Sequence, residues 1–189
     1  RDSSSGISKM KDSIRDKIND IETLNTSYER FVPKEFLTLL EKDAITDVNI
    51  GDSTSLKMGV LFSDMRNFTG MSEKMSPEEN FKFFNRYLEF MTPAIKKYNG
   101  FIDKYIGDAV MALFPTSAED AVLAAVEMNK QLAVYNSDEP TSGKEPVNMG
   151  VGIHIGQLVL GTIGRELRME TTVILSLIHI SEPTRLQQI

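Results

Sequence analysis

The feature that most constrains this chain is a pair of aspartates, each standing where a short apolar segment meets a turn. Asp64 follows the apolar run 58–62, and Asp108 lies between the apolar runs 100–106 and 109–114. A carboxylate at a strand end, followed by a turn with exposed backbone, suits a divalent cation together with phosphate oxygens. Two such carboxylates, brought together by sheet pairing, suit two-metal phosphoryl chemistry. The alternative is that each aspartate only caps a helix or shapes a turn.

The segment between the two aspartates carries strong helix signals. Ser76 is a capping residue, Pro77 suits the first helical position, and Glu79 at the third position completes a capping box. The helix is predicted to end at Tyr98, before Asn99-Gly100. Its apolar face consists of Phe81, Phe84, Tyr87, Leu88, Met91 and Ile95.

The remaining elements alternate between strands and helices. Residues 43–55 contain turn formers and few large apolar side chains, which indicates a loop or an edge segment. A helix over residues 118–135 is predicted to face inward with Ala121, Val122, Ala125, Met128 and Leu132. Strands are predicted over residues 57–63, 101–106, 109–114, 147–155 and 158–162, with turns at 107–108 and 156–157. This order predicts an α+β fold in which one mixed sheet packs against helices.

The N-terminal segment has a heptad pattern. Apolar residues recur at two alternating spacings, interrupted by Lys17: Ile7, Met10, Ile14, Ile21, Leu24, Tyr28 and Phe31. The pattern predicts that residues 1–30 contain a linker at residues 2–6, followed by a two-stranded parallel coiled coil. The alternative is an amphipathic helix that packs on its own domain. Pro33 then breaks the coil and suits the start of a short helix over residues 34–41.

Composition excludes several functions. The net charge is −6 and there is no basic tract, so nucleic-acid binding through a positive face is not expected. Cysteine is absent, which excludes disulfides and thiolate metal sites and fits a reducing cytosol. No apolar run approaches the roughly 20 residues of a membrane span. We therefore expect a cytoplasmic location for this part of the protein, and a membrane tether elsewhere in a longer parent protein stays open.

Three segments in the same order resemble the catalytic domain of class III nucleotidyl cyclases. They are Phe-Ser-Asp-Met-Arg-Asn-Phe-Thr at 62–69, Asp-Lys-Tyr-Ile-Gly-Asp-Ala-Val-Met-Ala-Leu-Phe at 103–114, and Gly-Val-Gly-Ile-His-Ile-Gly at 150–156. Residues 30–33, 161–164 and 168–170 also match, in the style of bacterial adenylate cyclases. The resemblance covers about residues 28–174 and marks residues 31–174 as the catalytic domain. It implies a ferredoxin-like core and the cyclisation of ATP to cyclic AMP and pyrophosphate.

The resemblance also implies a metal site. Asp64 and Asp108 match the family's metal-binding aspartates, and the carbonyl of Met65 matches its backbone ligand. Two divalent cations, Mg²⁺ or Mn²⁺, would activate the ribose 3′-hydroxyl and neutralise the triphosphate. The phosphates would meet the turn after Asp64 and the turn before Asp108, through Arg66, Asn67, Phe68, Thr69 and Gly107.

Base selection follows from two further positions. Lys104 matches the residue that hydrogen-bonds adenine in the family, where guanylate cyclases carry Glu. Thr172 stands where adenylate cyclases carry Asp or Thr. A lysine donor suits a ring nitrogen of adenine, and a threonine oxygen can accept from the 6-amino group. The alternative is that Lys104 is a solvated strand lysine and Thr172 an ordinary strand residue; His154 is expected to be structural.

Family sites lie across a homodimer, with the metals on one subunit and the base-reading residues on the other. The expected partners are therefore ATP, a second copy of the chain and an upstream sensor domain. A coiled coil leading into residues 30–33 could set how the two catalytic faces meet. A non-catalytic nucleotide-binding or regulatory module is the alternative function. A diguanylate cyclase or polymerase-palm relative would need a different hairpin motif.

The end of the chain departs from the family pattern. After Ile174 the family carries an Asn and an Arg that steady the ribose and the α-phosphate charge. Residues 175–185 instead read Leu-Ser-Leu-Ile-His-Ile-Ser-Glu-Pro-Thr-Arg, which resembles a translated sequencing-library adapter, with 186–189 as index sequence. A divergent natural tail is the alternative. We expect residues 175–189 to be foreign to the protein, and the chain as written to be inactive and poorly folded.

Overall fold

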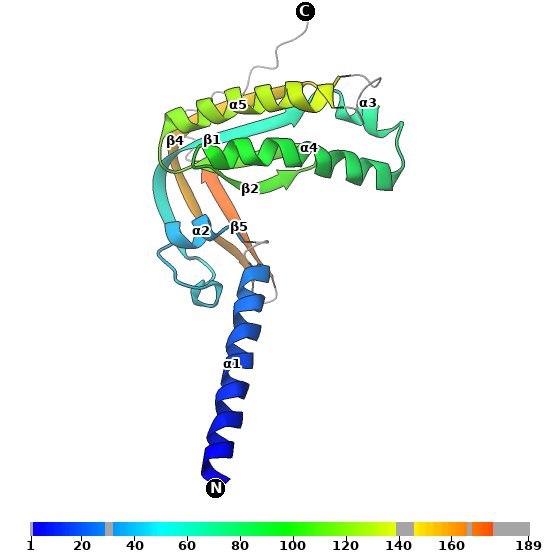
Figure 1. The fold of residues 1–189 in the computed structure, drawn as a ribbon. Helices are drawn as coiled ribbons and strands as arrows, with labels where there is room; N and C mark the ends of the chain where they lie inside the picture. The colour runs from blue at the N-terminus through cyan, green and yellow to red at the C-terminus, as the bar shows by residue number, and fades with distance from the viewer. Residues whose placement is uncertain (1, 29–31, 139–145, 166–167, 176–189) are drawn as a thin grey trace, which may run out of the picture.

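The computed structural model of the protein describes residues 2–28, 32–138, 146–165 and 168–175. Its elements are α1 (Asp2–Tyr28), α2 (Lys34–Leu39), a 3-10 helix (Ile45–Asp47), β1 (Ser53–Met65), α3 (Phe68–Ser72), α4 (Pro77–Lys97), β2 (Phe101–Ile106), β3 (Ala109–Phe114), α5 (Ala118–Ser137), β4 (Met149–Arg165) and β5 (Arg168–Leu175) (Figure 1). The predicted foreign segment lies outside the described residues, except for Leu175 at the end of β5. Residues 30 and 31 also lie outside them.

The five strands form one sheet in the order β2-β3-β1-β4-β5. Every pairing between these described strands is antiparallel. β1 and β2 run in the same direction but are separated by β3, which is the split βαβ arrangement of ferredoxin-like folds. The predicted α+β class is confirmed. The prediction that the sheet is mixed is wrong for the described strands, because β3 lies between the two strands that could have formed a parallel pair.

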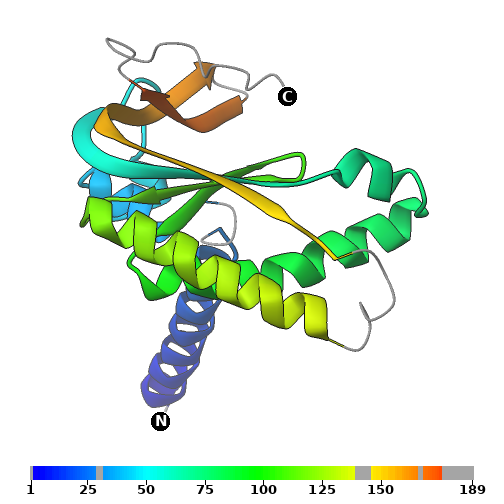
Figure 2. The same ribbon diagram turned by 90° about the horizontal axis from the view of Figure 1, so that it is seen from above.

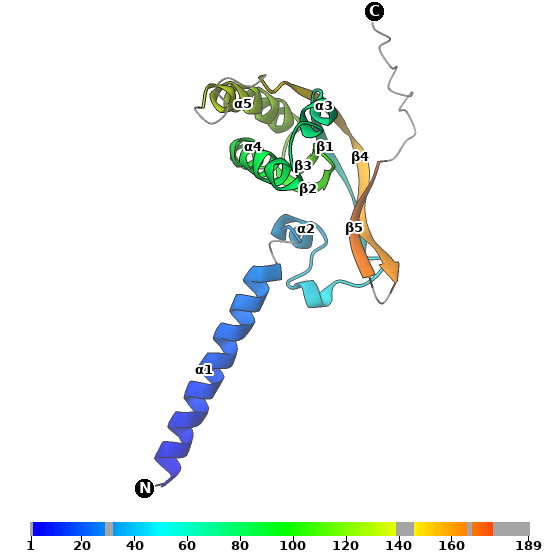
Figure 3. The same ribbon diagram turned by 90° about the vertical axis from the view of Figure 1, so that its right-hand side faces the viewer.

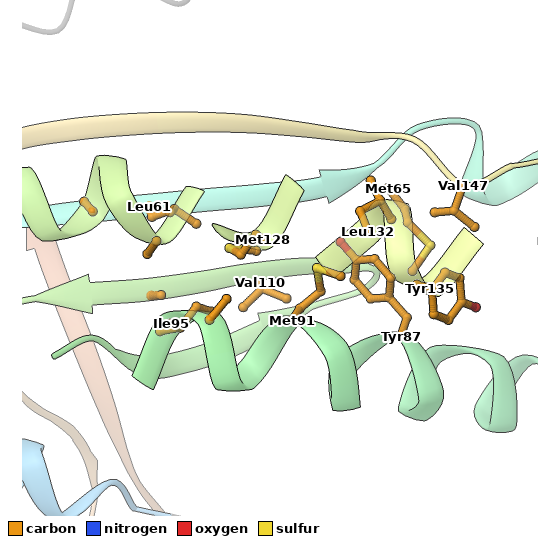
Figure 4. Close-up of a cluster of buried hydrophobic side chains, with 14 of the residues drawn as sticks. Leu61, Met65, Tyr87, Met91, Ile95, Val110, Met128, Leu132, Tyr135 and Val147 are labelled. Carbon is orange, nitrogen blue, oxygen red and sulfur yellow. The ribbon is translucent and has the colours of Figure 1, made fainter. Parts of the chain in front are cut away.

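Helices cover both faces of the sheet. α4 and α5 pack on one face (Figure 2), where the larger core includes Leu61, Met65, Tyr87, Met91, Ile95, Met128 and Leu132 (Figure 4). α2 covers part of the other face (Figure 3), with a second cluster that includes Phe36, Met58, Val60, Leu113 and Leu160. Side chains alternate along β1, so Leu61 belongs to the first cluster and Val60 to the second.

The two central strands are longer than predicted. Gly156 and Gln157, predicted as a turn, pair with Met58 and Lys57 of β1. This ladder runs unbroken from Ser53 to Met65, so β1 holds β4 extended through the predicted turn. The predicted loop over residues 43–55 is also partly wrong, since β1 begins at Ser53 and uses polar residues that face solvent.

α4 begins and ends where the sequence predicts. The Ser76 hydroxyl accepts from the Glu79 N–H at 3.2 Å, and the Glu79 carboxylate accepts from the Ser76 N–H at 2.8 Å. This reciprocal capping box satisfies two otherwise unpaired donors. At the other end Asn99 has φ 57°, and the Gly100 N–H donates to the Ile95 carbonyl at 3.1 Å. The helix therefore stops with a left-handed residue before β2.

α5 faces the core with a different stripe from the predicted one. Val122 is 48% exposed and Ala125 is only partly buried, so the inward placement of Val122 is wrong. The buried side chains recur at helical spacing: Ala121, Ala124, Met128, Leu132 and Tyr135. The sequence offered two adjacent apolar stripes, and packing on α4 and the sheet selects one of them.

α1 extends away from the rest of the fold (Figures 1 and 3). It begins at Asp2, so residues 2–6 are helical, and their role as a linker to an upstream domain stays a prediction. The heptad side chains face solvent, with Ile14 53% and Ile21 60% exposed. The alternative in which this helix packs on its own domain is therefore wrong, and the coiled coil stays a prediction. Within the described segments, no helix has the length and hydropathy to cross a membrane.

A close contact between Gly100 and Phe114 gives a stability test. A Cβ at Gly100 would overlap the ring of Phe114, which is fully buried and has no free space to move into. We expect Gly100→Ala to lower the free energy of unfolding by about 1–3 kcal/mol. Urea unfolding measures it. Adding Phe114→Leu should recover part of the loss, and equal effects of Gly100→Ala in both backgrounds would contradict this contact.

Candidate active site

The two aspartates of the predicted metal site come from neighbouring strand ends. Ser63 and Met65 are buried on either side of Asp64. Since side chains alternate along β1, Asp64 points away from the face that α4 and α5 cover. Asp108 lies in the tight turn between β2 and β3, directly after Gly107, whose φ of +62° suits a glycine. Because β3 pairs with β1, this turn lies beside the end of β1.

The carboxyl groups of Asp64 and Asp108 interact directly. Partial desolvation raises the pKa of Asp64, and the hydrogen bond and negative charge of Asp108 raise it further, while Arg66 opposes the shift. A divalent cation would remove the repulsion between two such carboxylates, so the pair fits a metal ion. The described residues hold no cluster of three or more His, Cys, Asp or Glu side chains. Further ligands would therefore come from the backbone or from a bound molecule.

The interaction between these carboxyl groups predicts a pH-dependent stability effect. Because the pKa of Asp64 is higher in the folded protein than in the unfolded chain, protonation of this carboxyl favours the folded state. This contribution to stability is complete below the unfolded pKa of about 4 and is lost as pH rises through the folded pKa. Asp108→Asn removes the like charge. We expect this variant to melt higher at pH 7 in chelator, by ~2 °C or less, and to match the parent at pH 3.5. Thermal melts with Glu89→Gln as control measure this, and equal melting at pH 7 would contradict it.

The turn after Asp64 is shaped by its own side chains. The Arg66 guanidinium lies over Gly150, which is opposite Asp64 on β4 and leaves room for it. Asn67 adopts a left-handed conformation, with φ 59°, and starts the short helix α3. Phe68 packs its ring against α4, 6.4 Å from the ring of Phe83. Phe68 therefore anchors the turn and could meet a phosphate only through its backbone, whereas Thr69 is exposed.

Tyr87 is a neighbour of the carboxylates that the sequence indicated only as core. It extends from α4 toward the sheet (Figure 4), and its hydroxyl has no hydrogen-bond partner among the described residues. Burial raises its pKa, and the charges of Asp64 and Asp108 contribute in the same direction. Tyr87 therefore stays neutral in the core between α4 and the sheet, on the face opposite the one to which Asp64 points. A tyrosine on a predicted apolar helix face carried no signal for this location.

The predicted base-reading lysine reaches β5 beside Thr172. The Nζ of Lys104 donates a hydrogen bond to the Thr171 carbonyl of β5 at 3.2 Å. That carbonyl belongs to the peptide joining Thr171 to Thr172, so the lysine bonds to the backbone of β5 next to the predicted residue and not to the Thr172 side chain. The Lys104 side chain is 32% exposed, and Thr172 is half-buried. Lys104 therefore has a protein hydrogen-bond partner, and the role of both residues in binding a base stays a prediction, as does the alternative of an ordinary strand lysine and threonine.

Lys104 and Asp64 lie on one face of the sheet, whereas Thr172, next to Val173 of the second cluster, points to the other face. Lys104 is paired with Met111 of β3, and Met111 is paired with Phe62 of β1. Cross-strand partners share a face, and Asp64 lies two residues beyond Phe62 on the same side. Within the described parts of the chain, no hydrogen bond or ion pair joins the Lys104 group to the carboxylates. Lys104 and the two aspartates are therefore separate positions on one chain.

Comparisons with known proteins agree with this geometry. Residues 52–172, more than half of the chain, match the family described as Adenylate and Guanylate cyclase catalytic domain. An adenylate cyclase of Anabaena cylindrica is 37% identical over 180 residues, covering 93% of this chain and 36% of the relative. The chain thus spans about a third of that relative's length.

Solved structures give the same result. The guanylyl cyclase Cya2 is 37% identical with a TM-score of 0.60, over 66% of each chain. The adenylyl cyclase CyaB from P. aeruginosa is 32% identical with a TM-score of 0.60, over 66% of this chain and 68% of that one. The family match, the ferredoxin-like sheet and the facing aspartates agree, and this chain belongs to the adenylate and guanylate cyclase catalytic-domain family.

Proposed function

We propose that this chain is the catalytic domain of an adenylate cyclase, which converts ATP to 3′,5′-cyclic AMP and pyrophosphate. The observation that carries the proposal is the facing pair of Asp64 and Asp108 on the open side of a cyclase-family sheet. The Anabaena relative and CyaB, both named as cyclases of ATP, support this substrate. Because Cya2 is named as a guanylyl cyclase, the choice between ATP and GTP depends on the side chains that contact the base.

The reaction needs charge control more than covalent chemistry. The ribose 3′-oxygen attacks the α-phosphorus, the bond from that phosphorus to the bridging oxygen breaks, and pyrophosphate leaves. The proton of the 3′-hydroxyl passes to solvent water as the new oxygen–phosphorus bond forms. Asp64, Asp108 and the Met65 carbonyl would hold two divalent cations, Mg²⁺ or Mn²⁺, which supply Lewis-acid stabilisation of the attacking and leaving oxygens. Arg66 and the N–H groups of the turn that follows it would face the phosphates.

We propose that Lys104 and Thr172 select adenine. The ammonium of Lys104 donates to a ring nitrogen that accepts in adenine but carries hydrogen in guanine. We expect Lys104→Glu to lower kcat/KM for ATP by about 100-fold, because it removes a charged hydrogen bond and adds a repulsive acceptor. The measurement is cyclic AMP formation from ATP beside cyclic GMP formation from GTP. Lys96→Glu, a charge reversal on α4, should change neither, and retained ATP preference in Lys104→Glu would contradict the assignment.

We also propose that active sites form across a homodimer. Among the described residues no hydrogen bond or ion pair joins Lys104 to the two aspartates, so the carboxylates of one copy would work with the Lys104 group of the other. The solvent-facing heptad residues of α1 provide an apolar seam for pairing two chains. An upstream sensor domain in a longer protein could then act through α1 on the alignment of the catalytic faces.

A further proposal concerns residues 175–189, which we infer to be foreign to the natural protein. The chain as written should make no cyclic AMP from ATP and Mn²⁺, and detectable synthesis would contradict this. Sequencing the source DNA past codon 174, by a method without transposase adapters, should give a continuation with the expected Asn and Arg. If codons 175–189 are genuine, a nucleotide-binding or regulatory module becomes the better function. The activity experiments on variants require the complete protein.

A further inference from the structure

Asp103 has an unusual place next to the predicted base-reading lysine. The pairing of β2 with β3 moves from Ile102 opposite Ala112 to Lys104 opposite Met111, so Asp103 is the extra residue of a β-bulge. Ala112 and Met111 are consecutive on β3 and point to opposite faces. The bulge therefore sends Lys104 to the face opposite Ile102, although the two residues are two apart in sequence.

This change of face is what brings Lys104 to the side of Asp64. Ile102 packs against the core formed by α4 and α5. A regular strand would place Lys104 on that same helix-covered face, where its ammonium group could not meet a nucleotide. The bulged residue is thus required for the lysine to reach the open surface of the sheet.

The Asp103 carboxylate is itself deeply buried. Its side chain is 2% exposed, and its Oδ2 makes no hydrogen bond among the described residues. Oδ2 lies 3.5 Å from the Nζ of Lys104, so the lysine is its ion-pair partner. Burial raises the pKa of this carboxyl, and Lys104 opposes the shift. A buried carboxylate depends strongly on the cation with which it forms an ion pair.

The Lys104 ammonium group is thereby held from two sides. One N–H donates to the Thr171 carbonyl, and the Asp103 carboxylate attracts the positive charge from the other side. An ammonium group has three donors, which leaves an N–H for a ligand on the open face. Asp103 also lines a hollow of about 710 Å³ between α2, α4 and β2, where Lys34 and Lys96 are further cations.

We propose that Asp103 is a positioning residue, whose buried carboxylate and bulged backbone hold Lys104 for adenine and so set the preference for ATP over GTP. The inference rests on the proposed role of Lys104. It differs from it, because Asp103 touches no substrate and acts only through the lysine. An isosteric loss of the charge should therefore change base preference while leaving the phosphate chemistry intact.

The test is a double-mutant cycle in the complete protein, with Asp103→Asn, Lys104→Met and both together. Asp103→Asn should raise KM for ATP about 10-fold, leave kcat within about twofold and reduce the ATP-to-GTP preference. In the Lys104→Met background the same change should have less than about a twofold effect. Lys96→Met, in the same hollow, is the control and should keep the parent preference.

Thermal melting adds a readout that is independent of catalysis. Lys104→Met leaves the Asp103 carboxylate buried and unpaired, so it should melt several degrees below the parent at pH 8, and adding Asp103→Asn should restore the melting temperature. Unchanged base preference in Asp103→Asn, or equal effects with and without Lys104, would overturn the positioning role. If Lys104→Met itself leaves base preference unchanged, the proposed adenine selection fails as well.

Discussion

Asp64→Asn should reduce the kcat of the complete enzyme by at least about 10³-fold while the domain stays folded. The amide has the same shape as the carboxylate but loses the charge that would bind a divalent cation. Metal-based stabilisation of the reacting oxygens is worth several kcal/mol, and each 1.36 kcal/mol is a factor of ten in rate. The measurement is cyclic AMP formation at saturating ATP and Mn²⁺.

The melting temperature of this variant shows whether a loss of activity comes from lost metal binding or from unfolding. Desolvation and Asp108 raise the pKa of Asp64, so its charge does not stabilise the metal-free fold. Asp64→Asn should therefore melt at or above the temperature of the parent protein at pH 7. Glu89→Gln, an exposed carboxyl on α4, is the matched control and should retain full activity. More than a tenth of parental kcat in Asp64→Asn would rule out this carboxylate as a metal ligand.

Ile14→Asp with Ile21→Asp should abolish both dimerisation and activity. These side chains belong to the heptad seam and face solvent in the single chain. Two aspartates would place four like charges in the centre of a paired seam, where they have no partners. If active sites need two chains, the monomer should lose at least about 100-fold in activity. Sedimentation and cyclic AMP assays at the same protein concentration measure both effects.

A matched variant adds the same charges elsewhere on α1. Asn19 and Thr26 occupy positions of the heptad repeat away from the seam, and both are exposed. Asn19→Asp with Thr26→Asp should therefore remain dimeric and active. Full activity of the Ile14→Asp, Ile21→Asp protein would contradict the proposal that the coiled coil aligns the catalytic faces.

Local signals predicted the elements that depend on local chemistry. The hairpin of β2 and β3 has the predicted bounds, because two apolar runs flank a Gly-Asp turn. The capping box at Ser76 and the stop at Asn99 fixed the ends of α4 for the same reason. The continuity of β4 through Gly156 could not be predicted, since it depends on pairing with β1, far away in sequence.

The residues of the candidate site also differ in whether local sequence could predict them. Asp64 and Asp108 could be predicted because their flanking residues mark strand ends and match a family motif. Tyr87 and Asp103 could not be predicted as site neighbours, because each depends on contacts across the fold. A two-residue alternation over β2 would also put Lys104 on the wrong face, and only the bulge observed at Asp103 corrects it.

Adenylate cyclase activity is best tested by giving the complete protein ATP and GTP separately with Mn²⁺ and measuring both cyclic products. We expect cyclic AMP and pyrophosphate in equal amounts from ATP, with at least about 10-fold lower kcat/KM for GTP. A preference for GTP would contradict the assignment of Lys104 and Thr172. No product from either nucleotide, in a protein that carries the expected Asn and Arg, would contradict an active cyclase.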